Sequence, residues 1–220
     1  MIKKIFRAGF ICLLILTLWH IPCQAVMVGF DFSGKTPEFP TGDLGAPLHL
    51  FIHDYTMPYA GFATSVTFRN DSDTTSGDQP ISLLILSPVT GGWNVANRVD
   101  LSDSIFNHGV PGDTTYLLPT ALSVSQGDIF AHWQDQGPGP IPLNIPADDA
   151  INPYYGSSNG QYGFNSNDID QGDFIANAGF TGARDYFINL NLTSVPEPTT
   201  MLLFGLGLIG LAGVRRRLRN

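Results

Sequence analysis

The central part of this 220-residue chain contains no cysteine. Both cysteines, Cys12 and Cys23, lie within the first 25 residues. Residues 26–194 therefore offer no disulfide, no thiolate metal ligand and no cysteine nucleophile. Their fold must be held by a buried apolar core instead.

Basic residues are also scarce in this 169-residue body. It contains four, Lys35, Arg69, Arg98 and Arg184, against 18 acidic residues, which gives a net charge of −14. Nucleic-acid binding is excluded as a function class, because neutralising phosphates requires clustered lysine and arginine. The same balance opposes docking on anionic lipid and suits divalent cations.

The body lacks residues that cover helix surfaces. Seventeen of its 18 acidic residues are Asp, with Glu38 the exception, and Lys35 is its single lysine. Asp favours turns and caps, whereas Glu and Lys favour exposed helix positions. Gly, Pro, Asn and Ser are abundant, which favours many short strands joined by turns.

Strand-like segments recur at short intervals along the body. The segment 48–55 alternates Leu and Ile with His and aromatic residues, and 81–86 is apolar throughout. The predicted strands are 26–32, 48–55, 61–69, 81–86, 93–101, 114–118, 122–124, 129–134 and 184–192. Two segments predict loops: proline-rich 137–146, and 152–163 with its Gly, Ser, Asn and Tyr.

These patterns predict the fold class as all-β. Eight or nine short strands in one domain, residues 26–194, fit a β-sandwich of jelly-roll type, flanked by an N-terminal signal peptide and a C-terminal hydrophobic helix. The expected core includes Leu83, Ile85, Phe130, Tyr186, Ile188 and Leu190.

Residues 1–25 are typical of a secretory signal peptide. Lys3, Lys4 and Arg7 precede an apolar run, and small residues at Cys23 and Ala25 predict cleavage by signal peptidase after Ala25. An uncleaved anchor is the alternative, but the run is shorter than the ~20 residues that span a bilayer. A lipoprotein would attach lipid at Cys23, yet the preceding His-Ile-Pro is unlike a lipobox.

The other end has three parts in a fixed order. Pro196, Glu197 and Pro198 form a stiff extended segment, and an apolar run of 14 residues, 201–214, follows. As a helix this run is about 21 Å long at ~1.5 Å per residue. A basic stop closes the chain at Arg215, Arg216, Arg217 and Arg219. Arginine clusters stay on the cytoplasmic side of a membrane, so the body is expected outside.

This end resembles the PEP-CTERM sorting signal, over residues 195–220. The resemblance implies recognition by an exosortase near Pro196-Glu197-Pro198. It also implies a Gram-negative host that makes extracellular polysaccharide. The expected location is the outer envelope, cell surface or extracellular matrix, with the C-terminal helix as a transient inner-membrane anchor. The tail implies nothing about what the body does.

One loop carries oxygen ligands that could hold a structural calcium ion. Asn167, Asp168, Asp170 and Asp173 surround a turn through Gly172, although the EF-hand register fails here. The alternative, and the better supported one, is a solvated Asx-rich turn. His49 and His53 lie about 13 Å apart along a strand, which is too far for one ion.

Aromatic residues suggest a sugar-binding surface. Tyr154 and Tyr155 lie in the predicted loop 152–163 and could stack on sugar rings, whereas Trp93 and Trp133 fit core positions of strands better. We therefore favour a non-catalytic envelope or matrix protein that binds extracellular polysaccharide. The alternative is a secreted, glycosidase-like hydrolase with an Asp-based site. The two differ in whether acids and aromatics gather in one concave pocket or scatter.

Overall fold

The computed structural model describes residues 25–42, 49–53, 55–72, 79–134, 139–145, 153–158, 169–176 and 180–194, and six separate residues between 205 and 215. For 153–158 and 180–183 only the backbone is described. Residues 25–195 form a compact unit of their own. Residues 1–24 of the predicted signal peptide, 1–25, lie outside the described residues.

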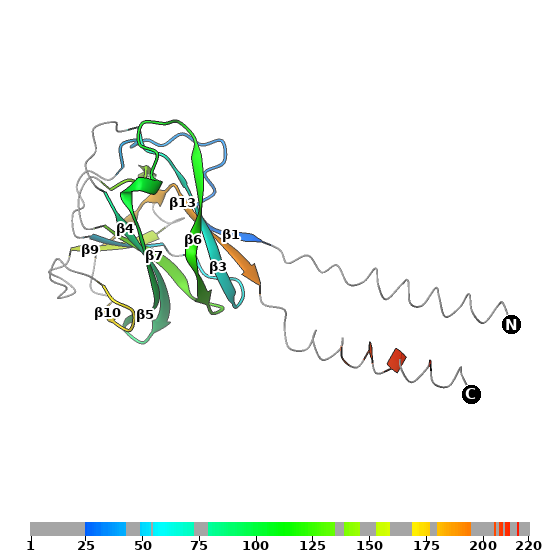
Figure 1. Ribbon diagram of the computed structural model, residues 1–220. Coiled ribbons are helices and arrows are strands. Elements are labelled where there is room, and N and C mark those ends of the chain that lie inside the picture. The colour runs from blue at the N-terminus through cyan, green and yellow to red at the C-terminus, as the bar shows by residue number, and fades with distance from the viewer. Residues whose placement is uncertain are drawn as a thin grey trace, which may run out of the picture. The chain divides into compact units, whose positions relative to one another are not determined.

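The compact unit is built from antiparallel sheets, one of which is curled into a half-barrel (Figure 1). The smaller main sheet has four strands, in the spatial order β1 (Val26–Gly29), β13 (Ile188–Ser194), β3 (Gly61–Arg69) and β6 (Asp113–Val124). This part of the prediction, an all-β body, is confirmed.

The larger sheet has seven strands. Their spatial order is β10 (Phe174–Ala176), β5 (Gly92–Leu101), β4 (Ile81–Val89), β7 (Ile129–Gln134), β2 (His49–His53), β9 (Pro153–Ser158) and β11 (Phe180–Ala183). A separate short pair joins β8 (Leu143–Asn144) to β12 (Asp185–Tyr186), and a single turn of 3-10 helix, η1 (Asp103–Ile105), precedes β6.

One apolar core lies between the two main sheets. Alternate residues of each strand point into it, as the two-residue period of a strand requires. The smaller sheet contributes Val28, Ala63, Val66, Phe68, Leu118, Leu122, Ile188, Leu190 and Leu192, and the larger sheet contributes Phe51, Leu83, Ile85 and Phe130. The six core residues predicted from the sequence are all buried, which confirms that prediction.

A second apolar cluster covers the opposite face of the larger sheet. It contains Trp93 and Trp133 together with Ile169, which precedes β10, and Ile175, which lies within β10. Both tryptophans are buried, so they are core residues as the sequence favoured.

Both predicted loops contain strands, and this is a correction. In 152–163 the backbone of β9 pairs with β2 and β11, and in 137–146 β8 pairs with β12. Pairing with neighbours overrides the weak local strand preference of Gly- and Pro-rich sequence. The two short strands predicted at 114–118 and 122–124 are one strand, β6. A bulge places Leu117 opposite Ser65 and Leu122 opposite Ala63, so the strand passes Pro119 without a break.

The described residues of the C-terminal segment have α-helical backbone. They are Gly205, Gly207, Leu208, Gly210, Leu211 and Arg215. Among the residues that the structure describes, no helix has the length and apolar character needed to cross a membrane. The hydrophobic helix expected here stays a prediction.

Candidate functional site

The residues predicted to direct export lie mostly outside the described part of the chain. This applies to Pro196, Glu197, Pro198, Arg216, Arg217 and Arg219. Arg215 is described and exposed. Ala25 is exposed and directly precedes β1, so the predicted cleavage after Ala25 would leave the first strand intact.

The acidic loop predicted to bind calcium is described only from residue 169, so Asn167 and Asp168 lie outside. Asp173 Oδ2 accepts the backbone N–H of Asp170 at 2.9 Å, and the Asp173 N–H donates to the Asp170 carbonyl at 3.1 Å. Arg98 Nη1 donates to the Ile169 carbonyl at 3.1 Å and lies 3.3 Å from Asp170 Oδ1. A guanidinium therefore occupies the side of the turn where Asp170 would face a cation.

No metal centre is formed by the residues that the structure describes: no three His, Cys, Asp or Glu side chains among them come close enough to hold an ion. The calcium hypothesis stays a prediction, since half of its ligands are not described. Tyr154 and Tyr155 are placed by backbone alone. They lie in β9, paired with His53 and Ile52 of β2.

A buried pair of histidines lies in the main core. His53 Nε2 and His132 Nδ1 share a hydrogen bond of 2.8 Å, and both side chains are almost fully buried. Aromatic rings surround them: Phe130 stacks on His53, while the edge of Tyr186 meets both imidazoles. Burial lowers the pKa of His132 to about 3. Burial and the neighbouring His132 lower the pKa of His53 well below its ordinary value.

A third histidine, His108, is partly buried and bridges two carboxylates, of which Asp71 is buried and Asp103 is partly exposed. His108 Nδ1 lies 2.9 Å from Asp71 Oδ1, and its Nε2 lies 2.9 Å from Asp103 Oδ1. Asp71 follows β3 and Asp103 begins η1, so this bridge fastens the loop before β6 to the end of β3. Both ring nitrogens face carboxylates, so neither is free to act as a general base.

The bridge favours the protonated imidazole. Partial burial lowers the pKa of His108, but its hydrogen bonds to Asp103 and Asp71 and their negative charges outweigh that effect, so the pKa is raised. Because the folded-state pKa lies above the ordinary value, the bridge stabilises the fold fully below about pH 6.5. That stabilisation is lost as the pH rises through the raised pKa.

We predict that His108→Gln flattens the alkaline side of the stability profile. The wild-type protein should lose about 1–2 kcal/mol between about pH 6 and pH 9, the magnitude of a hydrogen bond to a charged group. The variant should lose much less, as judged by urea midpoints at each pH. Asp103→Asn is the matched control, because it keeps an acceptor and removes one charge. It should shift the loss to lower pH, and an unshifted profile would contradict the bridge.

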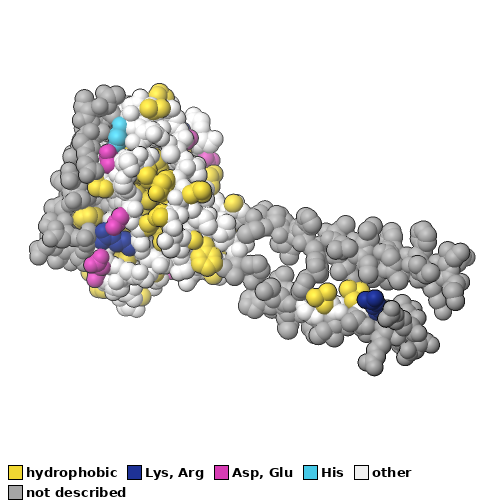
Figure 2. Space-filling model, in the orientation of Figure 1, with side chains coloured by type: hydrophobic (Ala, Val, Ile, Leu, Met, Phe, Trp, Pro, Cys, Tyr) yellow, Lys and Arg dark blue, Asp and Glu magenta, His cyan; other side chains and the backbone are white. Residues whose placement is uncertain are grey.

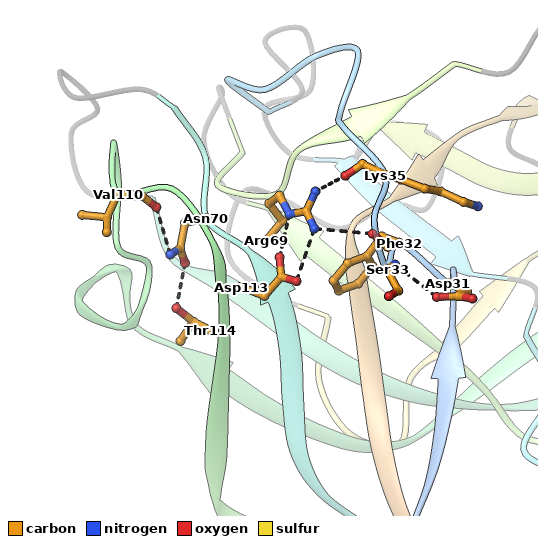
Figure 3. A network of polar contacts seen from close by, with 9 residues as sticks. All are labelled: Asp31, Phe32, Ser33, Lys35, Arg69, Asn70, Val110, Asp113 and Thr114. Carbon is orange, nitrogen blue, oxygen red and sulfur yellow. Dashed lines mark hydrogen bonds and ion pairs between the residues drawn. The ribbon is translucent and has the colours of Figure 1, made fainter.

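Arg69 holds the N-terminal segment against the smaller sheet (Figure 3). Its guanidinium forms a two-pronged pair with Asp113, with Nε–Oδ1 2.6 Å and Nη2–Oδ2 3.2 Å, and it donates to the carbonyls of Lys35 and Phe32. Its Cζ lies 5.2 Å from the ring centre of Phe187. The planar guanidinium matches the two oxygens of the Asp113 carboxylate. Because Arg69 also bonds to the carbonyls of the N-terminal segment, its role is structural.

All four basic residues of the body are engaged within it. Besides Arg69, Lys35 places its Nζ 4.0 Å from the ring centre of Phe30, and Arg98 pairs with Asp100 at 2.8 Å. Arg184 is half-buried and also engaged. Burial raises the pKa of Asp100, but hydrogen bonds from Arg98 and Ser82 outweigh this and lower it.

The outer face of the smaller sheet carries very little charge. Its four strands contain one acidic and one basic residue, Asp113 and Arg69, which pair with each other at one end. In Figure 2, yellow and white side chains cover the region of β3 and β6, and most magenta, blue and cyan side chains of the domain lie to their left. We call this surface the neutral face. Its residues are Met27, Phe62, Ser65, Thr67, Thr115, Leu117, Asn189, Asn191 and Thr193.

Polar side chains in the middle of the neutral face bond to each other. Asn191 Nδ2 donates to Ser65 Oγ and Thr67 Oγ1, both at 2.9 Å, and Thr67 Oγ1 lies 2.9 Å from Thr115 Oγ1. Asn189 Oδ1 closes over Gly29, whose φ is +141°; a Cβ there would lie 2.2 Å from this oxygen. Both the backbone conformation and the packing therefore require glycine at this position.

The sequence analysis did not find the buried histidine pair, the His108 bridge or the neutral face. His53 and His132 stand at alternating positions otherwise filled by Phe51 and Phe130, which indicated an inward direction but not a partner. The pairing depends on β2 lying beside β7 in one register, where His53 faces Phe130 and Phe51 faces His132. The neutral face had a visible signal, since residues 114–127 and 186–194 contain no charge.

Comparison with protein families finds one match: the PEP-CTERM protein-sorting motif, at residues 194–217. This confirms the resemblance for the C-terminal segment alone. A protein with this motif is exported, processed by an exosortase and sorted to the cell envelope. Neither the curated proteins nor the solved structures contain a match to the chain.

Proposed function

We propose that this chain is a non-catalytic protein of the outer envelope, cell surface or extracellular matrix, and that its β domain binds extracellular polysaccharide. The sorting motif supplies the destination. The observation that carries the non-catalytic part is the state of the acidic residues. All ten described carboxylates make contacts within the domain, many of them in turns, caps and ion pairs, which favours a structural role for these ten.

The charge of the body points to an uncharged glycan. With a net charge of −14 and only four basic residues, all of them engaged internally, the domain has little positive charge to offer a uronate, sulfate or phosphate group. Long-range repulsion would oppose an acidic polymer as well. A neutral polysaccharide avoids both costs. Successive residues of a strand lie on opposite faces of its sheet, so we expect one of Tyr154 and Tyr155 to stack on its rings.

We further infer that the domain is a β-sandwich of the jelly-roll class with an insertion. The chain moves between the two main sheets at nearly every connection: β1 in the smaller, β2 in the larger, β3 in the smaller, β4 and β5 in the larger, then β6 and β7. The resulting orders, β1-β13-β3-β6 and β2-β7-β4-β5, support two interleaved Greek keys. The insertion comprises β8 to β12.

Glycan binding is tested with the exported protein on an array of neutral and acidic polysaccharides. We expect retention on neutral chains, and loss of at least tenfold in affinity when Tyr154 and Tyr155 are both replaced by alanine, because stacked aromatics carry much of such contacts. Trp93→Phe, a buried change, is the control. Release of new reducing ends from any glycan would contradict the non-catalytic proposal, and retention on acidic chains alone would contradict the charge argument.

The sorting step is tested by replacing Pro196, Glu197 and Pro198 with alanine. We expect the full-length precursor to accumulate in the inner membrane, held by the hydrophobic segment 201–214, while the wild-type protein reaches the outer envelope in a shorter form. Fractionation and immunoblotting measure both species. Alanine at Thr199 and Thr200 provides a neighbouring control. Normal processing of the triple variant would argue against an exosortase acting at this sequence.

A further inference from the structure

We propose that the neutral face is where two copies of this chain associate. This interface is separate from the proposed glycan site. It pairs the outer surface of β1, β13, β3 and β6 with the same surface of a second copy. A surface that meets itself in this way is expected for a symmetric dimer.

Charge is the first argument. Two bodies that each carry −14 repel each other, and at physiological salt this repulsion acts over about 8 Å. Close approach is therefore favoured where both surfaces lack charge. The four strands of the neutral face contain only the mutually paired Arg69 and Asp113, so this sheet can meet its copy without bringing like charges together.

Exposed apolar side chains are the second argument. Met27 is 61 % exposed and Leu117 is 75 % exposed, and the strand register places them in one row, Met27 beside Asn191, Asn191 beside Ser65 and Ser65 beside Leu117. They stand about 14 Å apart, three strand spacings, on either side of the polar centre. Phe62, 42 % exposed, adds an aromatic ring to the same surface.

The polar centre explains why the occupant is a protein surface rather than a sugar. Asn191, Thr67 and Thr115 already bond to one another, which lowers the cost of excluding water from them. The same bonds leave these side chains little capacity to bind sugar hydroxyls. A second copy is also at hand: the sorting motif begins at residue 194, where β13 ends, and confines exported copies to one membrane surface before release.

The absence of cysteine from the mature body makes the proposal testable in the full chain. Leu117→Cys is expressed in an exporting host and treated with a short bis-maleimide. We expect a covalent dimer of the chain at least fivefold above that of Val89→Cys, a control at the β4–β5 turn whose side chain is 40 % exposed. Adding Met27→Asp should reduce the Leu117→Cys dimer at least fivefold. Met27→Cys is a second reporter if Leu117→Cys is poorly exported.

Each other outcome overturns the proposal. Equal yields at positions 117 and 89 would indicate random collision. A dimer that survives Met27→Asp would lie elsewhere on the domain. An adduct whose mass is not that of two chains would identify a different partner. Finally, raising sodium chloride from about 20 mM to about 150 mM should increase the yield, since screening weakens repulsion between acidic bodies. A decrease would mean that ion pairs hold the interface.

Discussion

Ile188→Asp is expected to unfold the β domain. Ile188 lies in β13, opposite Phe68 of β3, and is fully buried in the core between the two main sheets. The substitution removes about 2–3 kcal/mol of apolar burial. It also buries a carboxylate without a partner, which costs several kcal/mol more. A domain of this size is stable by roughly 5–15 kcal/mol, so one change consumes most or all of the stability.

The measurement is near-ultraviolet circular dichroism of the exported protein, with its thermal transition. The variant should show no cooperative transition above 25 °C. Ile188→Val, which deletes one methyl group, should cost about 1 kcal/mol. Leu117→Asp places the same charge on the same sheet at a side chain that is 75 % exposed, and should change stability by less than about 0.5 kcal/mol. A native-like transition in Ile188→Asp would mean that the core assignment is wrong.

Much of the fold could be predicted because alternation is a local property. The segments 61–69 and 129–134 were predicted with the bounds that β3 and β7 have, the first from its spaced apolar residues and the second from the turn at 126–128 that precedes it. The inward direction of Ile188, Leu190 and Phe130 followed from the same pattern. Sheet membership could not follow from it, because the order β5-β4-β7-β2 is decided by which strands meet in three dimensions.

The missed strands and sites share one cause. β9 is rich in Gly, Ser and Tyr and becomes a strand because β2 offers it an edge, a fact absent from its own composition. The Asp71–His108–Asp103 bridge joins residues from two loops that are distant in sequence. Acidic residues were conspicuous in the sequence, yet most of those described serve caps and ion pairs, because Asp is first of all a turn residue.

Acid is expected to destabilise the domain before its carboxylates titrate. His53 and His132 are neutral in the folded core, whereas in the unfolded chain each has a pKa near 6.5. The unfolded state therefore binds more protons as the pH falls below about 6.5. For His132 this continues down to a pKa of about 3. Stability should fall by about 1.4 kcal/mol per pH unit for each histidine in this range, roughly 4 kcal/mol for the pair at pH 5.

The change of folding stability with pH that His108 contributes has the opposite sign. Its pKa is raised in the folded state, so below about pH 6.5 it is protonated whether the chain is folded or unfolded, and its contribution there is flat. The loss of stability at low pH, which we call the acid limb, is thus caused by the buried histidine pair. The loss at high pH is caused by the His108 bridge. Maximum stability should lie between them, near neutral pH.

The double variant His53→Phe/His132→Phe tests the acid limb. Replacing both partners by apolar rings of similar shape removes the shared hydrogen bond from both sides at once, and the contact of His132 with Gln134 is the one other polar interaction lost, so the fold should survive at pH 7. Between pH 6.5 and pH 5 its urea midpoint should change little, while that of the wild type falls steeply. His132→Phe alone should be less stable than either, because it strands the ring nitrogen of His53.

Imidazole NMR of the wild-type protein provides a check that needs no substitution. The signals of His53 and His132 should remain those of neutral rings throughout the folded range down to about pH 5, while the signal of His108 should titrate at a higher pH than that of an ordinary imidazole. Protonation of either buried ring near pH 6.5 in the folded protein would show that water reaches the core. The acid limb would then need another cause.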